Sequence, residues 1–279
     1  MTRFVQVVCL LVCLSLAMSA PAFALAKRQA AAAGGPPSRH DWKKMTIVDQ
    51  GKVKAFLRGD LIMLDNYRRY RLVNILIPPY EDPRAAEALR EKFLGDYVTV
   101  YAYPQDNGAW ATDKQGLPLV HVVTQQGAWL QQFLVRNGLA HAYNSYAGNA
   151  LLPQLMYAEN QAAEAHAGLW QGTANGIKAP DQAGDYVGSY EIVEGRIMSV
   201  RYSNSGGGIF FNFGTNVLTC FSAILPDEFL MWYTEGDRRY AVRTSDWTGR
   251  NVQLRGWIVE ENHKPVMHIT NKDQINVLP

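Results

Sequence analysis

The sequence VKAFLRGDLIML occupies positions 53–64. Its two ends, 53–57 and 61–64, are short apolar runs of the kind that form strands, and Arg58-Gly59-Asp60 separates them. Glycine tolerates unusual backbone angles, and an aspartate side chain accepts hydrogen bonds from nearby backbone, so both residues are common in tight turns. This stretch therefore predicts a β-hairpin.

More strand-like runs and several helical repeats follow the hairpin. Strands are predicted at 70–77, 97–103 and 119–123, and helices at 83–94, 129–137 and 152–166. Five strands with interspersed and trailing helices favour a small closed barrel of the OB type. The predicted fold class is mainly β with helices (α+β).

The C-terminal third of the chain has a strand pattern of its own. Strands are predicted at 190–202, 209–213, 217–224, 252–259 and 266–269, with an amphipathic helix at 227–233 after the third strand. This order suits a second OB-like small β-barrel. The sequence SNSGGG at 203–208 is typical of a hairpin loop between the first two of these strands.

The first residues have the pattern of a secretory signal. Arg3 precedes an apolar run from Phe4 to Met18, and Ala22-Phe23-Ala24 provides a small-x-small cleavage site. We expect a signal peptide at 1–24 and a mature protein that is periplasmic or secreted and has no transmembrane segment. An uncleaved anchor is the alternative, but the run is about 15 residues long and crossing a bilayer takes roughly 20.

Two stretches have the composition of linkers. Residues 25–44 include AAAAGGPP at 30–37, and residues 173–184 are rich in Gly, Ala, Asn, Asp and Pro. Neither offers an apolar face to bury. We therefore predict two folded domains, at 45–172 and at 185–279.

The charge balance argues against a strongly basic nucleic-acid binder. The chain has 27 Lys and Arg, of which only Arg3 lies in the signal, so 26 remain against 25 Asp and Glu. Basic residues gather only locally, for example at Arg68-Arg69 and Arg71. Cys220 is the single cysteine after the signal, so it forms no internal disulfide.

Several blocks of the first domain resemble the staphylococcal nuclease (thermonuclease) family in order and spacing. Arg58-Gly59-Asp60-Leu61-Ile62 is similar to the family's Asp-Gly-Asp-Thr-aliphatic turn. Similar blocks also occur at 70–78 (the Arg-Leu-x-Gly-Ile-Asp-x-Pro strand), at 113–117 (the Asp-x-Tyr-Gly-Arg turn), and at 134–140 and 158–170 (the two later helices). The resemblance implies a staphylococcal-nuclease-like OB-fold barrel at 45–172. Asn212-Phe213-Gly214 and Arg255-Gly256-Trp257-Ile258 resemble, more briefly, a tail found on some bacterial members.

The resemblance also implies a chemistry, the hydrolysis of phosphodiesters with one calcium ion. In the family two aspartates hold the ion, a glutamate acts through water, and two arginines contact the phosphate. These residue types are suitable because Ca²⁺ prefers several oxygen ligands and guanidinium groups stabilise the charge that gathers on phosphorus. Asp60 is at the position of the first metal aspartate, and Arg71 is at the position of the first arginine.

Three of the five expected side chains are replaced. Leu76 is at the position of the second metal aspartate, Pro79 at that of the glutamate and Leu117 at that of the second arginine. A site with one carboxylate has too little negative charge to hold calcium well, so we expect no cofactor, or Ca²⁺ if the site is active. Glu81 is the candidate replacement for the lost catalytic glutamate, with Asp82 beside it, if the loop rearranges.

Five residues are candidates for contact with nucleic acid. They are Arg68, Arg69, Phe210, Phe211 and Arg255. The two phenylalanines would form a platform on which single-stranded bases stack. The alternative is that these aromatic residues fill the second barrel, because few basic residues accompany them.

The sequence is compatible with three functions. The first is an exported non-catalytic binding protein whose ligand is nucleic acid, another polymer or an envelope protein partner. The second is an active calcium-dependent phosphodiesterase of the thermonuclease type that uses Asp60, Arg71 and Glu81. The third is a structural module of an envelope protein assembly. The loss of catalytic groups within an intact framework favours the first.

Overall fold

The structure is a computed structural model that describes residues 37–79, 81–105, 108–171, 176–203, 207–229 and 244–278. The predicted signal peptide, most of the linker at 25–44 and part of the linker at 173–184 lie outside these residues. Within the described ranges, no helix is both long enough and apolar enough to span a membrane.

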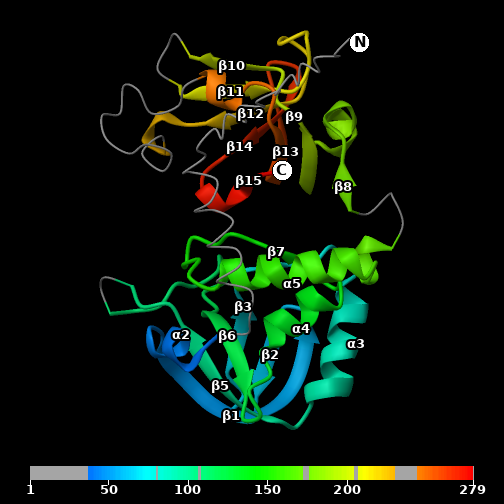
Figure 1. Cartoon of the computed structure of the whole chain (residues 1–279). Coiled ribbons are helices and arrows are strands. Elements are labelled where there is room, and N and C mark those ends of the chain that lie inside the picture. Colours follow the sequence, from blue (N-terminus) through cyan, green and yellow to red (C-terminus); the bar gives the residue numbers. More distant parts are fainter. Residues whose placement is uncertain are drawn as a thin grey trace, which may run out of the picture.

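The first part of the chain forms a closed five-stranded barrel (Figure 1). Its strands are β1 (Thr46–Arg58), β2 (Leu61–Leu64), β3 (Arg69–Leu72), β5 (Tyr97–Ala102) and β6 (Leu119–Thr124). They are arranged in the order β1-β2-β3-β6-β5, and only the β3–β6 pair is parallel. The 13-residue β1 closes the barrel because its first half pairs with β5 and its second half with β2. This confirms the predicted OB-type barrel and its first hairpin.

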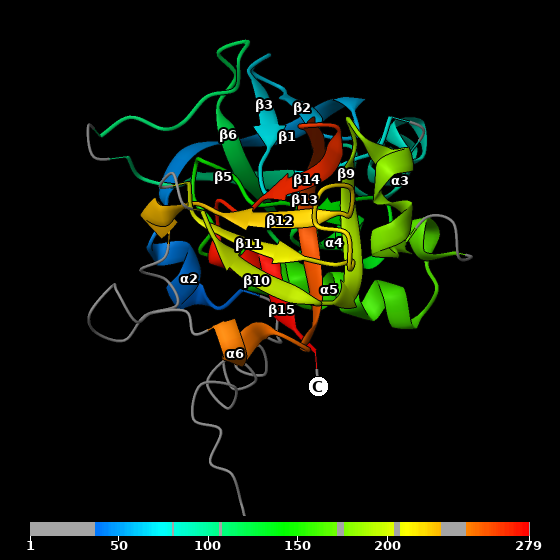
Figure 2. The same ribbon diagram turned by 90° about the horizontal axis from the view of Figure 1, so that it is seen from above.

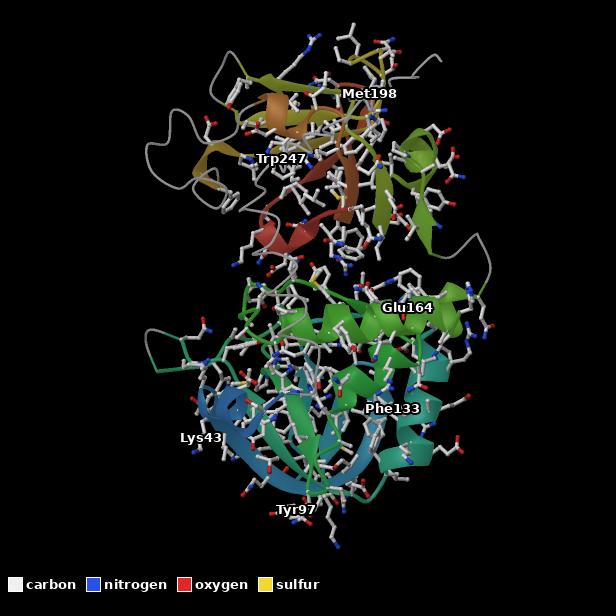
Figure 3. The ribbon with its side chains drawn as sticks, viewed as in Figure 1. Lys43, Tyr97, Phe133, Glu164, Met198 and Trp247 are labelled. Carbon is white, nitrogen blue, oxygen red and sulfur yellow. The ribbon has the colours of Figure 1, made fainter. Side chains whose placement is uncertain are left out.

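Four helices pack around this barrel. They are α2 (Arg39–Lys43), α3 (Asp82–Phe93), α4 (Leu130–Arg136) and α5 (Leu152–Glu164), and the 3₁₀ turn η1 (Gly168–Trp170) follows α5. The apolar face predicted for 83–94 is the buried face of α3, where Phe93 meets Phe133 of α4 edge to face with ring centroids 5.0 Å apart. Figure 3 labels Phe133 beside α4. The core thus joins the helices to the barrel.

The single strand predicted at 70–77 is divided in two at Asn74. β3 ends at Leu72, and a second short strand, β4 (Ile75–Leu76), pairs with β7 (His141–Ala142) instead of continuing the barrel. Asn74 has a left-handed backbone (φ 60°), which asparagine tolerates better than most residues. Its buried side-chain amide donates to the backbone carbonyls of Tyr143 and Gly148, so contacts distant in sequence fix the turn.

The C-terminal part forms a second sheet whose strand order matches that of the first barrel (Figure 2). Its main strands are β9 (Tyr190–Arg196), β10 (Ser199–Tyr202), β11 (Ile209–Asn212), β12 (Ser222–Leu225), β13 (Asn251–Glu261) and β14 (Lys264–His268). The order is β10-β11-β12-β14-β13-β9, with β12 and β14 parallel. β9 and β10 stand at opposite ends of this order, yet only two residues of chain separate them. The first and last of these strands are therefore consecutive in the sequence. It is the OB-like arrangement that the sequence predicted.

Smaller elements complete this half. They are β8 (Ile177–Lys178), η2 (Pro180–Tyr186), α6 (Thr244–Trp247), η5 (Lys272–Gln274) and β15 (Ile275–Val277). The strand predicted at 217–224 begins only at Ser222, because the Asn216 carbonyl accepts from the amides of Thr219 and Cys220 and curls the chain into a turn. In the predicted helix 227–233, residues 227–229 form one short helical turn and the rest lies outside the described residues.

A buried ion pair joins the two halves. Arg255 of β13 is 3% exposed, and its Nη1 lies 2.5 Å from Oε2 of Glu159, a residue of α5 that is 1% exposed. Glu159 Oε1 accepts from the backbone amide of Ala142, and the Tyr190 hydroxyl donates to the carbonyl of Ala142. Nearby, Ile192 of β9 packs against buried residues of α5 and η1. Both charge pairing and apolar packing therefore cross this boundary.

The environment of Glu159 keeps it ionised. Burial alone would raise the pKa of Glu159, but the Arg255 guanidinium and the hydrogen bond with His141 outweigh it and lower the pKa to about 2. A carboxylate with a lowered pKa stabilises the fold above its ordinary pKa of 4.5, and this contribution is lost as the pH falls toward 2.

Arg255→Met is expected to lower the free energy of unfolding by about 3–5 kcal/mol, because it leaves the Glu159 charge buried without its cation. Adding Glu159→Gln should recover much of that loss, and it should also flatten the fall in stability between about pH 4.5 and 2. Chemical denaturation measures both effects. Arg136→Met, at an exposed position on α4, is the matched control. A double variant no more stable than Arg255→Met would contradict the ion-pair interpretation.

Candidate functional site

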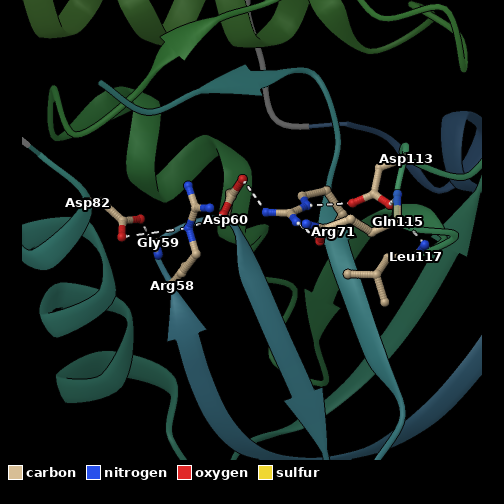
Figure 4. A network of polar contacts seen from close by, with 8 residues as sticks. All are labelled: Arg58, Gly59, Asp60, Arg71, Asp82, Asp113, Gln115 and Leu117. Atoms are coloured by element: carbon tan, nitrogen blue, oxygen red, sulfur yellow. Dashed lines mark hydrogen bonds and ion pairs between the residues drawn. The ribbon is translucent and has the colours of Figure 1, made fainter. Parts of the chain in front are cut away.

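The first element of the candidate site is the β1–β2 turn, which brings Asp60 next to Arg71. Leu61 of β2 pairs with Arg71 of β3, so the residue before Leu61 lies beside the arginine. Arg71 Nη1 donates to Asp60 Oδ2 at 2.8 Å (Figure 4). The structure therefore brings together the two site residues that the sequence retained.

A second carboxylate also holds the arginine. Arg71 Nε donates to Asp113 Oδ2 at 3.0 Å, and Nη2 donates to Gln115 Oε1 at 3.3 Å. Asp113 Oδ1 in turn accepts from the backbone amides of Gln115 and Leu117, at 2.8 and 2.9 Å. The Arg71 side chain is only 15% exposed, so protein acceptors occupy much of its hydrogen-bonding capacity.

The charges of this cluster support one another. Partial burial would lower the pKa of Arg71, but the Asp60 and Asp113 carboxylates outweigh it and raise the pKa. Burial would likewise raise the pKa of Asp113, whereas hydrogen bonds from the Leu117 and Gln115 amides and from Arg71 lower it. Arg71 is therefore a cation bound between two acidic side chains.

The start of α3 packs against the same turn. Asp82 Oδ1 accepts from the Gly59 amide at 2.8 Å, and Arg58 Nε lies 3.5 Å from Asp60 Oδ1 and 3.8 Å from Asp82 Oδ2. A Cβ at Gly59 would lie 2.7 Å from the Cβ of Ala85, so only glycine fits this close approach. Asp82 is thus the carboxylate from the 81–82 pair that contacts the turn.

Glu81, the proposed replacement for the catalytic glutamate, lies apart from these contacts. Its side chain is 2% exposed and one carboxylate oxygen forms an ion pair with Arg84, while Oε2 has no hydrogen-bond partner within the described structure. The Glu81 amide donates to the Pro78 carbonyl, which fixes the residue at the entrance of α3.

The three replaced positions keep structural rather than ligand-binding contacts. Leu76 pairs with His141 in the β4–β7 ribbon, and Leu117 contributes its backbone amide to Asp113. Neither side chain, nor that of Pro79, carries an oxygen or a cation. Across the residues that the structure describes, no three His, Cys, Asp or Glu side chains form a group suited to a metal ion.

The other predicted contact residues divide between surface and interior. Arg68 and Arg69 are exposed, and Arg68 lies 3.9 Å from Asp49. Phe210 is half-buried beneath Lys264. Phe211 is 1% exposed and Arg255 is bound to Glu159, so neither is available to a ligand in this structure. The strand alternation explains Phe211: with Ile209 it faces the core, as the barrel-filling alternative holds.

Sequence reasoning missed Asp113 as a partner of Arg71. The signal is present, since DKQGL at 113–117 resembles a family turn, but the resemblance draws attention to the arginine that this block lacks and not to Asp113. Asp113 holds its own turn and the arginine at once, a dual role that appears only when β3 and the 113–117 turn are brought side by side.

The fold and the cluster together define a class of protein: an OB-type barrel of the nuclease kind, with an acidic turn and an arginine on adjacent strands. Residues 65–172 match the family model described as Staphylococcal nuclease homologue. Two relatives described as an uncharacterized endonuclease, from Escherichia coli O157:H7 and Escherichia coli, are each 30% identical over 135 residues, which cover 46% of this chain and 82% of the relative. The chain belongs to the staphylococcal nuclease family.

Asp113→Ala is expected to loosen the 113–117 turn, because it removes the charged acceptor of two backbone amides. Each such bond contributes about 1.5–3 kcal/mol, so exchange of the Gln115 and Leu117 amides should accelerate at least about tenfold. Hydrogen exchange followed by NMR measures this rate. Lys114→Ala, an exposed change in the same turn, should leave both amides protected. Unchanged exchange in the Asp113 variant would show that the turn holds without the carboxylate.

Proposed function

We propose that this chain is an exported, non-catalytic member of its family that binds nucleic acid. The observation that carries the proposal is the engagement of Arg71 by Asp60 and Asp113 within hydrogen-bonding distance. A guanidinium already paired with two carboxylates has little capacity left to stabilise a phosphorane-like charge. Family membership supports nucleic acid as the ligand class.

Calcium does not fit the residues present. Asp60 Oδ2 is committed to Arg71, and the positions that would supply the second aspartate and the glutamate carry Leu76 and Pro79. Ca²⁺ takes six to eight oxygen ligands, several of them charged. The Asp60 carboxylate is also next to two guanidinium groups, those of Arg58 and Arg71, which repel a cation. The proposed protein therefore works without a metal cofactor.

Purified mature protein with millimolar calcium is expected to show no turnover of DNA or RNA above a control that carries Asp60→Ala and Arg71→Ala. One missing electrostatic partner commonly costs about 10² to 10³ in rate, and here three are replaced. Release of labelled fragments from single-stranded DNA measures the rate. A calcium-dependent rate that the double substitution abolishes would refute the non-catalytic proposal and point to Asp82 or Glu81 as the working carboxylate.

A restored variant provides the positive control. Leu76→Asp, Pro79→Glu and Leu117→Arg together return the missing groups, so calcium affinity should rise in calorimetry, with weak cleavage as a further outcome. Asp113→Asn added to this variant frees Arg71 from one carboxylate and should favour cleavage further. A folded triple variant with unchanged calcium binding would mean that positions 76, 79 and 117 do not line the site.

Export is supported by the sequence of residues 1–24, with its basic start, apolar run and small-x-small end. A reporter fused to residues 1–30 is expected to leave the cytoplasm and to be processed near Ala24. The matched control replaces Leu10, Leu11 and Val12 by charged residues, which interrupts the apolar run. A wild-type fusion retained in the cytoplasm would contradict export.

A further inference from the structure

The outer face of the β1–β2–β3 sheet has the Arg71 cluster at one end and a different composition at the other. Alternation along the strands sends Phe56, Ile62 and Tyr70 into the core, where each is at most 3% exposed. Ala55, Met63 and Arg69 alternate with these residues and face outward. One outward row follows from the pairing of Ala55 with Met63 and of Met63 with Arg69.

Basic residues dominate this face. Outside the Arg71 cluster, which includes Arg58 and Asp60, positions 52–69 have four Lys or Arg against one Asp, an excess of three in a protein whose formal net charge is +2. Lys54, beside Ala55, and Arg69 are both exposed. Among the residues that the structure describes, the Arg69 guanidinium has no hydrogen-bond or ion-pair partner. The two Asp of the segment are engaged elsewhere, Asp60 with Arg71 and Asp65 with the Lys52 amide.

An exposed aromatic ring stands at the edge of the same face. Tyr67, in the β2–β3 turn, is 68% exposed, and Lys54 Nζ lies 3.5 Å from its ring centroid. The Tyr67 backbone is left-handed (φ 65°), an unfavourable conformation for a bulky residue. The turn holds it there through the hydrogen bond from its amide to the Leu64 carbonyl. The lysine thus lies against the ring, while most of the Tyr67 surface remains open to solvent.

We infer that this β1–β3 face binds a single-stranded nucleic acid, with phosphates at Lys54 and Arg69 and a base stacked on Tyr67. Cationic side chains that follow the backbone, together with an aromatic ring for an unpaired base, are the usual elements of single-strand binding. A duplex would leave the Tyr67 ring without a base face. The inference rests on the proposed binding function, for which it names the ligand class and the surface.

The geometry also indicates which part of the face the bound strand occupies. Met63 pairs with Arg69 and, two residues along each strand, Leu61 pairs with Arg71. Arg71 is neutralised by two carboxylates, so the end of the face near Asp60 does not attract phosphate. The strand would therefore lie over the opposite end, at Lys54, Tyr67 and Arg69.

The test measures binding of a labelled oligodeoxythymidylate of about 12 nucleotides by fluorescence anisotropy, in chelator so that the probe stays intact. Lys54→Gln with Arg69→Gln should weaken binding and reduce the slope of log K against log salt by about 1.4, since each single-strand phosphate contact contributes about 0.7. Tyr67→Asn should weaken binding about 5- to 100-fold with a smaller change in slope, because it removes stacking. Asparagine also tolerates the left-handed turn.

Lys92→Gln with Arg136→Gln is the matched control, because both residues are exposed on α3 and α4 and the charge change is the same. This control should leave affinity and slope unchanged. Thermal unfolding of every variant separates loss of binding from loss of fold.

The outcomes separate this inference from the proposed function. If the wild type binds the oligonucleotide and the β1–β3 variants bind equally well, the surface is wrong and the binding function stands. Tighter binding of a duplex, or equal binding of a poly-glutamate peptide, would overturn the single-strand assignment. If the wild type binds no nucleic acid at all, both the surface and the ligand class of the proposed function fall, whereas the non-catalytic part is decided by the cleavage assay alone.

Discussion

The buried pair of Glu159 and Arg255 is the interaction on which the arrangement of the barrel and the C-terminal sheet depends. Both charges lie in the protein interior, where an unpaired ion lowers the free energy of unfolding. Each side chain therefore depends on the other for its stability there. Glu159 also accepts from Ala142 of β7, and β7 pairs with the strand that carries Leu76. The position of the family's second metal aspartate is therefore connected to the C-terminal sheet through the β4–β7 ribbon.

Basic side chains are paired with carboxylates at one end of the β1–β2–β3 sheet and lie without such partners in the described structure at the other. At one end Arg71 and Arg58 lie among Asp60, Asp82 and Asp113, so the charges balance within the protein. At the other end Lys54 and Arg69 face solvent and form no ion pair within the described part of the chain, so their charge is available to an anionic ligand. A nearly neutral chain can thus present a local basic surface, which whole-chain composition does not reveal.

Local patterns predicted the elements that depend on local physics. The β1–β2 hairpin and α3 follow from side-chain period and turn chemistry, which act over a few residues. The break at Asn74 did not follow, because residues near Gly148 hold that turn. Nor did the burial of Arg255, which appeared in the sequence as a basic partner for nucleic acid.

The sequence by itself determined the OB-type barrel, the second β sheet with its OB-like strand order, the family and the loss of the expected groups at Leu76, Pro79 and Leu117, because these are properties of residue types in order. Only the tertiary structure decided the partners of the charged groups. Arg71 meets Asp113 across 42 positions and Arg255 meets Glu159 across 96. Whether an arginine is free to bind a ligand or is neutralised depends on which carboxylate folding brings within a few ångströms, and the spacing of residues along the chain does not contain that distance.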